Sequence, residues 1–266
     1  MDSRITPFSI DIADSEIADL KARLAGARWP REAPVADWSR GVPTAYLREL
    51  AGYWADGFDW RQQQAALNTY PQFLTEIDGQ TFHFLHVRSK EANALPLVLC
   101  HGWPGSFIEF QKLIGPLTDP VAHGGKAEDA FDVVIPSLPG FGFSAPLSGP
   151  GWELGRTTRA YAEIMQRLGY DRYAAHGSDI GAGVAGHLAS FFPDRLVGVH
   201  VASERGMAAY IGVYMPVPAD LTEAEKAALD RIKAEGADGG GYMKLQQTRP
   251  QTLAYGLAES PLAQLA

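Results

Sequence analysis

Over residues 1–70, hydrophobic side chains recur at the spacing of an α-helix, which predicts helices and irregular structure rather than sheet. Three runs show this spacing, at residues 14–24, 44–54 and 58–67. The first opens on Asp14-Ser15-Glu16, and the second follows Pro43, as expected of residues that begin helices. These residues therefore predict an N-terminal helical extension.

From Gln72 the hydrophobic period changes to two. Residues 73–77 and 81–87 flank Asp78-Gly79, a dipeptide typical of β-hairpin turns. Continuous apolar runs then predict four strands buried on both faces, at residues 97–100, 131–136, 172–176 and 196–201. Helical runs alternate with them, at residues 106–116, at 157–168 and from the turn at 177 to about 192. This alternation predicts an α/β fold, with a mostly parallel sheet and helices on both faces.

Beyond Glu204 the strand pattern stops. Leu221 begins an amphipathic helix that extends to Glu235, residues 236–241 read as a flexible glycine-rich break, and residues 242–266 read as helical with two prolines. We expect these helices to form a cap over the carboxyl ends of the strands. The chain is thus divided into an extension (1–70), a core with six strands (71–204) and a cap (205–266).

Composition and charge exclude several classes of partner. The chain has 266 residues, of which 46% are hydrophobic, and a net charge of −8. An acidic protein is a poor ligand for nucleic acid or for an anionic membrane surface, so we expect neither partner, and a small neutral substrate instead. One cysteine, Cys100, fits a reducing compartment, and the sequence shows neither a signal peptide nor a spanning segment. We therefore expect a cytoplasmic protein.

The residues with the clearest chemistry are Gly177-Ser178-Asp179-Ile180-Gly181. Gly-x-Asp-x-Gly between a strand and a helix is typical of an elbow that presents its central residue at the top of a sheet. A frame centred on Ser178 lacks both flanking glycines, so the pattern favours Asp179 as a nucleophile over a serine. The alternative is that Asp179 caps a helix in an ordinary loop.

An aspartate nucleophile that attacks saturated carbon forms an alkyl ester, which implies an epoxide or an alkyl halide as substrate. Hydrolysis of the ester then needs two backbone N–H donors for the oxyanion. Ile180 can supply one, and Trp103, in the loop His101-Gly102-Trp103-Pro104 after an earlier strand, can supply the other. We predict no cofactor and no metal. A dinucleotide site is rejected because the glycines at 140–142 do not open a helix, as such a site requires.

These motifs resemble those of epoxide hydrolases of the α/β-hydrolase fold, in the branch with a long N-terminal domain that includes microsomal, fungal and bacterial enzymes. The resemblance covers nearly the whole chain. It rests on HGWPGS at 101–106, PSLPGFGFS at 136–144, HGSDIG at 176–181 and GYMKLQQTRPQTL at 241–253, with Trp54, residues 58–60 and residues 73–87 in support.

The resemblance implies Asp179 as nucleophile, the Trp103 and Ile180 amides as the oxyanion hole, and a cis peptide before Pro104. It also implies Tyr242 as the cap tyrosine that donates a proton to the epoxide oxygen. A phenol suits this role because its pKa of about 10 keeps it protonated until the alkoxide forms. Tyr210 and Tyr255, in the same region, are the alternatives.

In this fold a carboxylate and a histidine that activates water follow the cap. None of the seven histidines fits that role: His83 and His86 are expected to be structural, and His101 and His176 to fix loops by hydrogen bonds. We therefore expect an N-terminal portion that is poorly stable alone, which cooperative unfolding of residues 1–266 would test. The expected partners are an epoxide, water, and either a second copy of the chain or a complementing C-terminal chain.

Two other functions remain open. A haloalkane dehalogenase shares the fold, but Ile180 offers no halide donor, and the long N-terminal region also argues against it. A catalytically inactive fragment, or a module that only binds lipophilic molecules, is the other alternative.

Overall fold

The computed structural model describes residues 4–202 and 218–266. It divides into two compact units, one formed by Met1–Ser9 with Asn68–Arg231 and the other by Ile10–Leu67 with Ile232–Ala266. Each unit therefore draws on segments far apart in the sequence. The three-domain division made from the sequence remains a proposal.

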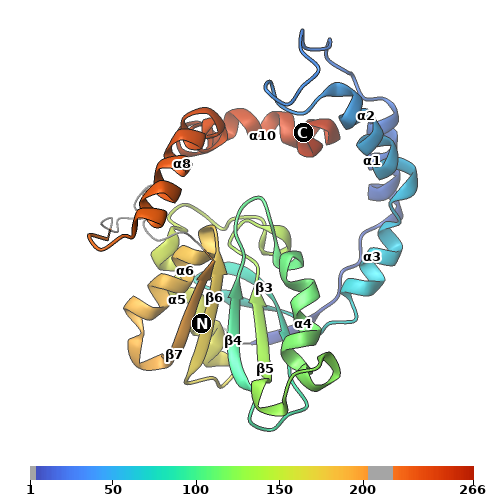
Figure 1. The fold of residues 1–266 in the computed structure, drawn as a ribbon. Helices are drawn as coiled ribbons and strands as arrows, with labels where there is room; N and C mark the ends of the chain where they lie inside the picture. Colours follow the sequence, from blue (N-terminus) through green and yellow to red (C-terminus); the bar gives the residue numbers. More distant parts are fainter. Residues whose placement is uncertain (1–3, 203–217) are drawn as a thin grey trace. The chain divides into compact units, whose positions relative to one another are not determined.

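The first unit is built on a sheet in the order β1-β2-β3-β5-β4-β6-β7 (Figure 1). Its strands are β1 (Ile5–Phe8), β2 (Gln72–Ile77), β3 (Gln80–Val87), β4 (Leu95–Cys100), β5 (Phe131–Pro136), β6 (Tyr173–Ser178) and β7 (Leu196–Ala202). The hairpin β2–β3 and the pair β3–β5 are antiparallel, whereas β5, β4, β6 and β7 are parallel to one another. The six strands predicted from residues 73–201 are all present.

The prediction that residues 1–70 contain no sheet is wrong for β1. This strand pairs antiparallel with β2, with Ile5 opposite Thr75, and the Thr75 hydroxyl donates to the carbonyl of Arg4 at 3.0 Å. Four residues that include Pro7 are too short to show an alternating pattern. The strand depends on a partner about 70 residues away, which local periodicity does not reveal.

Helices cover both faces of the sheet (Figure 1). They are α4 (Gln111–Thr118), which follows a 3₁₀ turn η2 (Phe107–Phe110), α5 (Leu154–Arg167) and α6 (Ile180–Phe191). Val98 of β4 lies in one buried cluster with Tyr161 of α5 and Val184 of α6, and each is completely buried. Leu99 points to the opposite face and is also buried, so the central strands are covered on both sides.

Two helix boundaries differ from the sequence prediction. The helix α4 does not end at Pro116 but continues to Thr118, since a proline already in helical geometry leaves the later hydrogen bonds intact. The N–H of Asp119 still donates to Gly115 at 2.9 Å. The helix α5 begins three residues earlier than Thr157, because the Glu153 carboxylate accepts hydrogen bonds from the first free amides of that helix.

The second unit is helical. It contains α1 (Asp14–Ala25), α2 (Thr44–Gly52), α3 (Trp60–Leu67), α9 (Gly241–Thr248), α10 (Pro250–Glu259) and α11 (Pro261–Leu265), with α8 (Glu223–Gly239) crossing from the first unit. Leu24, Ala51 and Leu262 form its buried cluster. The predicted flexible break at residues 236–241 is wrong, because α8 continues to Gly239 and the N–H of Gly240 donates to Gly236 at 3.0 Å.

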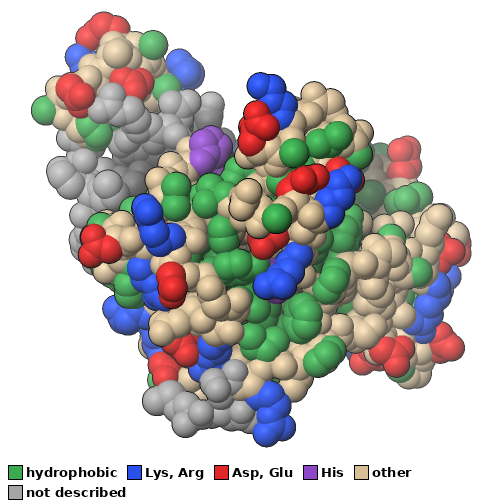
Figure 2. Space-filling model, turned by 90° about the horizontal axis from the view of Figure 1, so that it is seen from below, with side chains coloured by type: hydrophobic (Ala, Val, Ile, Leu, Met, Phe, Trp, Pro, Cys, Tyr) green, Lys and Arg blue, Asp and Glu red, His purple; other side chains and the backbone are tan. Residues whose placement is uncertain are grey.

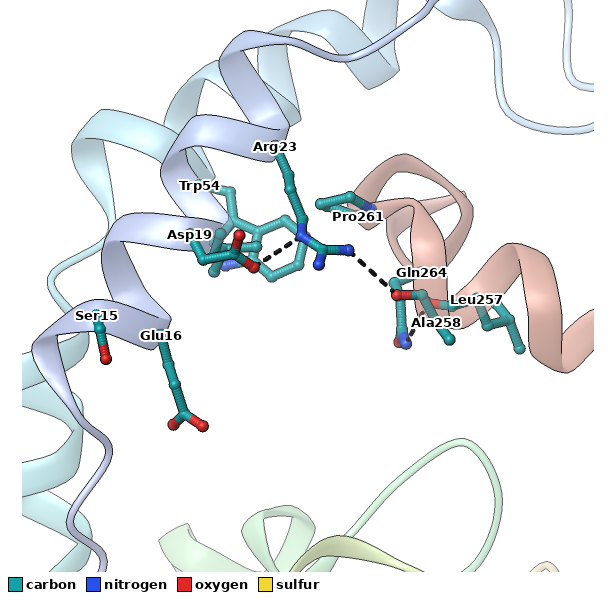
Figure 3. Close-up of a pocket in the computed structure, with 10 residues that line it drawn as sticks. Ser15, Glu16, Asp19, Arg23, Trp54, Leu257, Ala258, Pro261 and Gln264 are labelled. Carbon is teal, nitrogen blue, oxygen red and sulfur yellow. Dashed lines mark hydrogen bonds and ion pairs between the residues drawn. The ribbon is translucent and has the colours of Figure 1, made fainter.

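Figure 3 shows how α1 meets the C-terminal helices. Arg23 pairs with Asp19 at 2.7 Å and donates to the carbonyl of Glu259 at 3.1 Å. Asp19, Arg23 and Trp54 border a groove of about 650 Å³ within this unit. The exposed Arg23–Asp19 pair lies within α1 and does not join it to α11. The buried side chains of Leu24 and Leu262 therefore carry most of the association of α11 with α1.

His83 of β3 is a completely buried polar side chain. Its ring lies among Phe8, Phe107 and Phe143, and its nitrogens hydrogen-bond Gln72 and Ser137 at 2.9 Å. Burial lowers the pKa of His83 from 6.5 to about 4. The residue is structural, as predicted, and neutral in the folded protein at pH 7.

His83 predicts a pH-dependent stability. Between pH 6.5 and about 4, the imidazole of His83 binds a proton in the unfolded chain but not in the folded chain. The free energy of unfolding is therefore highest above pH 6.5 and falls as the pH drops through this range. The loss reaches about 3 kcal/mol at most. Urea unfolding across this range measures the slope. His83→Asn is expected to reduce this slope, and His123→Asn, at an exposed histidine, is the control.

In the parts of the chain that the structure describes, β7 lies at one edge of the sheet. It pairs with β6 on one side, and its valines are exposed, with Val197 at 50% and Val199 at 38%. Long apolar edge strands promote pairing between molecules. Val199→Lys is therefore expected to reduce concentration-dependent self-association of this chain, as measured by light scattering. Val121→Lys, which changes an exposed valine outside the sheet, serves as the control; an equal effect of both changes would contradict a role for the edge.

Candidate active site

Asp179 lies at the turn between β6 and α6. It is non-glycine, yet its backbone has φ 52° and ψ −125°, a conformation that costs free energy for an L-residue. The strand ends at Ser178 and the helix begins at Ile180, so Asp179 is the one residue between them. This is the tight elbow that the Gly-x-Asp-x-Gly pattern predicts, with an exposed carboxylate at its tip.

Two glycines allow this turn to form. A Cβ at Gly177 would overlap the Gly181 carbonyl and lie 2.8 Å from the nitrogen of Ala182. A Cβ at Gly181 would overlap Cys100 and lie 2.7 Å from the carbonyl oxygen of His101. All of these obstacles are backbone atoms, which cannot rotate away. Any side chain at either position would therefore separate α6 from the sheet.

The loop after β4 meets the elbow. β4 and β6 are parallel neighbours, with Cys100 opposite Gly177, so both loops leave the same edge of the sheet. The backbone N–H of Trp103 donates to Oδ1 of Asp179 at 2.8 Å. Gly102 makes this contact possible, because a Cβ there would overlap the Asp179 carboxylate. The Trp103-Pro104 peptide is cis, as expected.

His101 connects two loops beneath the site. It is completely buried, its Nε2 accepts a hydrogen bond from the N–H of Leu138 at 3.1 Å, and its Nδ1 lies 3.1 Å from the carbonyl of Gly102. Burial lowers the pKa of His101. Its contacts join HGWPGS to PSLPGFGFS, which agrees with the predicted loop-fixing role and leaves the ring no access to a substrate.

His176 differs from its prediction, because it bonds a neighbouring strand rather than a loop. Its Nδ1 lies 2.8 Å from Nδ1 of His200 on β7, with the two rings stacked. Only one of these nitrogens can carry the proton between them. Burial, and next the charge of His200, lower the pKa of His176.

Glu109 is a site residue that sequence reasoning missed. It lies in the 3₁₀ turn directly after HGWPGS, and its carboxyl group packs over Gly105, where a Cβ would meet the carboxyl carbon at 2.5 Å. Burial raises the pKa of Glu109, and the negative charge of Asp179 raises it further. The signal in the sequence was an acidic residue within an otherwise apolar turn beside the motif.

The other predicted site residues are placed as follows. Ile180 is the first residue of α6, so its N–H is at the helix N-terminus beside Asp179. Tyr242 lies on α9 and Tyr255 on α10, both in the second unit and both exposed. Tyr210 lies outside the described residues. The role of each of these residues remains a prediction.

Over residues 4–202 and 218–266, no cluster of three or more His, Cys, Asp or Glu side chains could hold a metal ion. In the same parts of the chain, none of the helices is long and apolar enough to cross a bilayer. On the face shown in Figure 2, basic and acidic side chains are interspersed with hydrophobic ones.

Two family models match the chain. The model described as "Epoxide hydrolase N terminus" matches residues 5–110, and the model described as "alpha/beta hydrolase fold" matches residues 96–229. Together they cover the helical extension, the sheet and the elbow. The fold predicted from the sequence is confirmed.

Individual relatives agree with these models. A Stigmatella aurantiaca protein named as a candidate epoxide hydrolase is 51% identical over 98% of this chain and 58% of its own length. Epoxide hydrolase 1 of Oryctolagus cuniculus is 33% identical over 98% of this chain and 60% of its own. The chain thus spans 58–60% of the length of these relatives. An enantioselective mutant of the Aspergillus niger epoxide hydrolase superposes with a TM-score of 0.85 at 33% identity, covering 99% of this chain and 67% of that one. The chain therefore belongs to the epoxide hydrolases of the α/β-hydrolase fold.

Proposed function

We propose that this chain carries out the epoxide-opening half of an epoxide hydrolase reaction, with Asp179 as the nucleophile. The substrate is a small lipophilic epoxide, and the complete reaction yields a vicinal diol. The acidic charge and the single cysteine support a cytoplasmic location. A second copy or a complementing C-terminal chain is the proposed protein partner.

In the first step, a carboxylate oxygen of Asp179 attacks a saturated carbon of the oxirane. The new C–O bond forms as the ring C–O bond breaks, and the ring oxygen leaves with the electron pair. Tyr242 donates a proton to this oxygen, so the product is a hydroxyalkyl ester of Asp179. A phenol suits the step because the alkoxide is a stronger base than a phenolate.

In the second step, water attacks the carbonyl carbon of the ester. Negative charge develops on the carboxyl oxygen, where the N–H groups of Trp103 and Ile180 stabilise it. Collapse of the intermediate breaks the ester C–O bond and restores the Asp179 carboxylate. The released alkoxide takes one proton of the attacking water to become the diol, and the other proton of this water returns Tyr242 to its phenol form. We assign no base for this water to any residue in the described parts of the chain, so the proposal for this chain rests on the first step.

The observation that carries the proposal is the hydrogen bond from the Trp103 amide to Asp179, at 2.8 Å, on a strained elbow. An ordinary helix cap would accept hydrogen bonds from the first turn of its own helix. The side chain of Asp179 makes no such bond, and instead accepts from a loop on the neighbouring strand. This hydrogen bond supports the proposal that Asp179 is the nucleophile and that the Trp103 N–H is an oxyanion donor.

The test is to incubate the purified chain with styrene oxide and to identify any adduct by peptide mass spectrometry. A stable hydroxyalkyl ester on Asp179 supports the proposal. Turnover to the diol supports it as well, and reveals a base not assigned above. The absence of both products would contradict it and favour a binding module or an inactive fragment.

A further inference from the structure

Glu109 is held in a defined position beside the oxyanion loop. Phe107 and Phe110 are three residues apart in the 3₁₀ turn, so they share one face, and both are buried. Glu109 lies off this face and is exposed, and its N–H donates to the carbonyl of Ser106 at 3.1 Å. The buried phenylalanines therefore fix the backbone of this turn and the direction of the Cα–Cβ bond of Glu109.

The two glycines of the HGWPGS loop accommodate two different carboxyl groups. A Cβ at Gly102 would lie 2.7 Å from Cγ of Asp179, and a Cβ at Gly105 would lie 2.5 Å from Cδ of Glu109. A larger residue at either position would displace the carboxyl group. The loop that carries the Trp103 donor is thus flanked by one carboxyl group at each glycine.

The charge of Glu109 is not balanced by a close partner. Among residues 4–202 and 218–266, no hydrogen-bond donor or cation pairs with its carboxyl group, whereas Asp179 accepts from the Trp103 amide. Gly102 and Gly105 are three residues apart in one loop, so the carboxyl groups that pack on them lie near each other. In agreement, partial burial raises the pKa of Glu109, and the Asp179 charge raises it further. An epoxide at Asp179 therefore lies in the field of two negative charges.

We propose that Glu109 is a specificity-determining residue that makes the site favour neutral over anionic epoxides. This inference rests on the proposed function and specifies its substrate class. An approaching anion is repelled by Glu109 as well as by Asp179, and a neutral epoxide is not. Removing the charge of Glu109 should therefore reduce the preference for neutral over anionic epoxides.

The experiment compares glycidamide with glycidate, which have nearly the same shape and differ by one negative charge. Rates of adduct formation on Asp179 are measured by mass spectrometry at mildly alkaline pH, because the pKa of Glu109 is raised and a higher pH favours its charged form. The wild-type chain is expected to react faster with glycidamide. Glu109→Gln is expected to narrow the ratio of the two rates by about threefold to tenfold, as for loss of a like charge near a protein surface. Any difference in intrinsic reactivity between glycidamide and glycidate is the same for every variant, so it cancels when the rate ratios of two variants are compared.

Glu128→Gln is the matched control, because it removes the same charge from an exposed glutamate away from the site in the same unit. It is expected to leave the ratio unchanged. Added salt gives a measurement that needs no variant: it should narrow the wild-type ratio more than the Glu109→Gln ratio. An unchanged ratio in Glu109→Gln, or an equal change in Glu128→Gln, would overturn this inference alone. The absence of any adduct with styrene oxide or glycidamide in the wild-type chain would overturn the proposed function, and this inference with it.

Discussion

Asp179→Asn is expected to slow adduct formation with styrene oxide by on the order of 10³-fold or more, to below detection, because an amide is not a nucleophile toward saturated carbon. The change is nearly isosteric. The amide oxygen of asparagine can still accept the hydrogen bond that the Trp103 N–H now donates to Oδ1. The fold should therefore persist while the chemistry is lost, and thermal unfolding of the variant should match that of the wild-type chain.

Asp171→Asn is the control for this result. Asp171 is an exposed aspartate just before β6, at the end of the strand opposite Asp179. Its replacement removes the same charge and should leave the rate of adduct formation unchanged. If Asp179→Asn still formed an adduct at the wild-type rate, the nucleophile would be a different residue, and the mass of the labelled peptide would identify it.

The elbow could be predicted from sequence because its determinants are local. Gly177, Asp179 and Gly181 lie within five residues, and the turn requires both glycines because a Cβ at either would overlap backbone atoms. The loop at Trp103 could be placed against it because the carboxyl ends of neighbouring parallel strands meet at one edge of the sheet. Their hydrogen bond joins residues 76 positions apart, and it depends on this topology and on the absence of a side chain at Gly102.

Features that depend on distant partners could not be predicted. β1 exists because β2 offers it an edge, and α11 contacts α1 and α2 because Leu262 completes a cluster with Leu24 and Ala51. Glu109 was missed for another reason. Its carboxyl group packs over Gly105, and the order of residues along the chain does not show this contact.

Gly181→Ala is expected to destabilise the chain by about 3 kcal/mol or more, and to abolish adduct formation as well. The added methyl group would overlap the carbonyl of Cys100 and lie 2.7 Å from that of His101. Both carbonyls belong to the end of β4 or the residue after it, beside buried side chains, so the strand cannot move aside. The helix α6 has to shift instead, and it carries Asp179 away from the Trp103 amide.

Gly186→Ala, in the same helix, is expected to have the opposite effect. A Cβ at Gly186 meets no atom within 4 Å, so alanine gains its higher helix propensity, about 0.5–1 kcal/mol, without any clash. Urea unfolding of the two variants therefore separates the close approach at residue 181 from the general effect of glycine in a helix. Equal destabilisation by both changes would mean that α6 as a whole, rather than its contact with β4, limits stability. If Gly181→Ala kept its adduct rate while losing stability, the position of Asp179 would not depend on this contact.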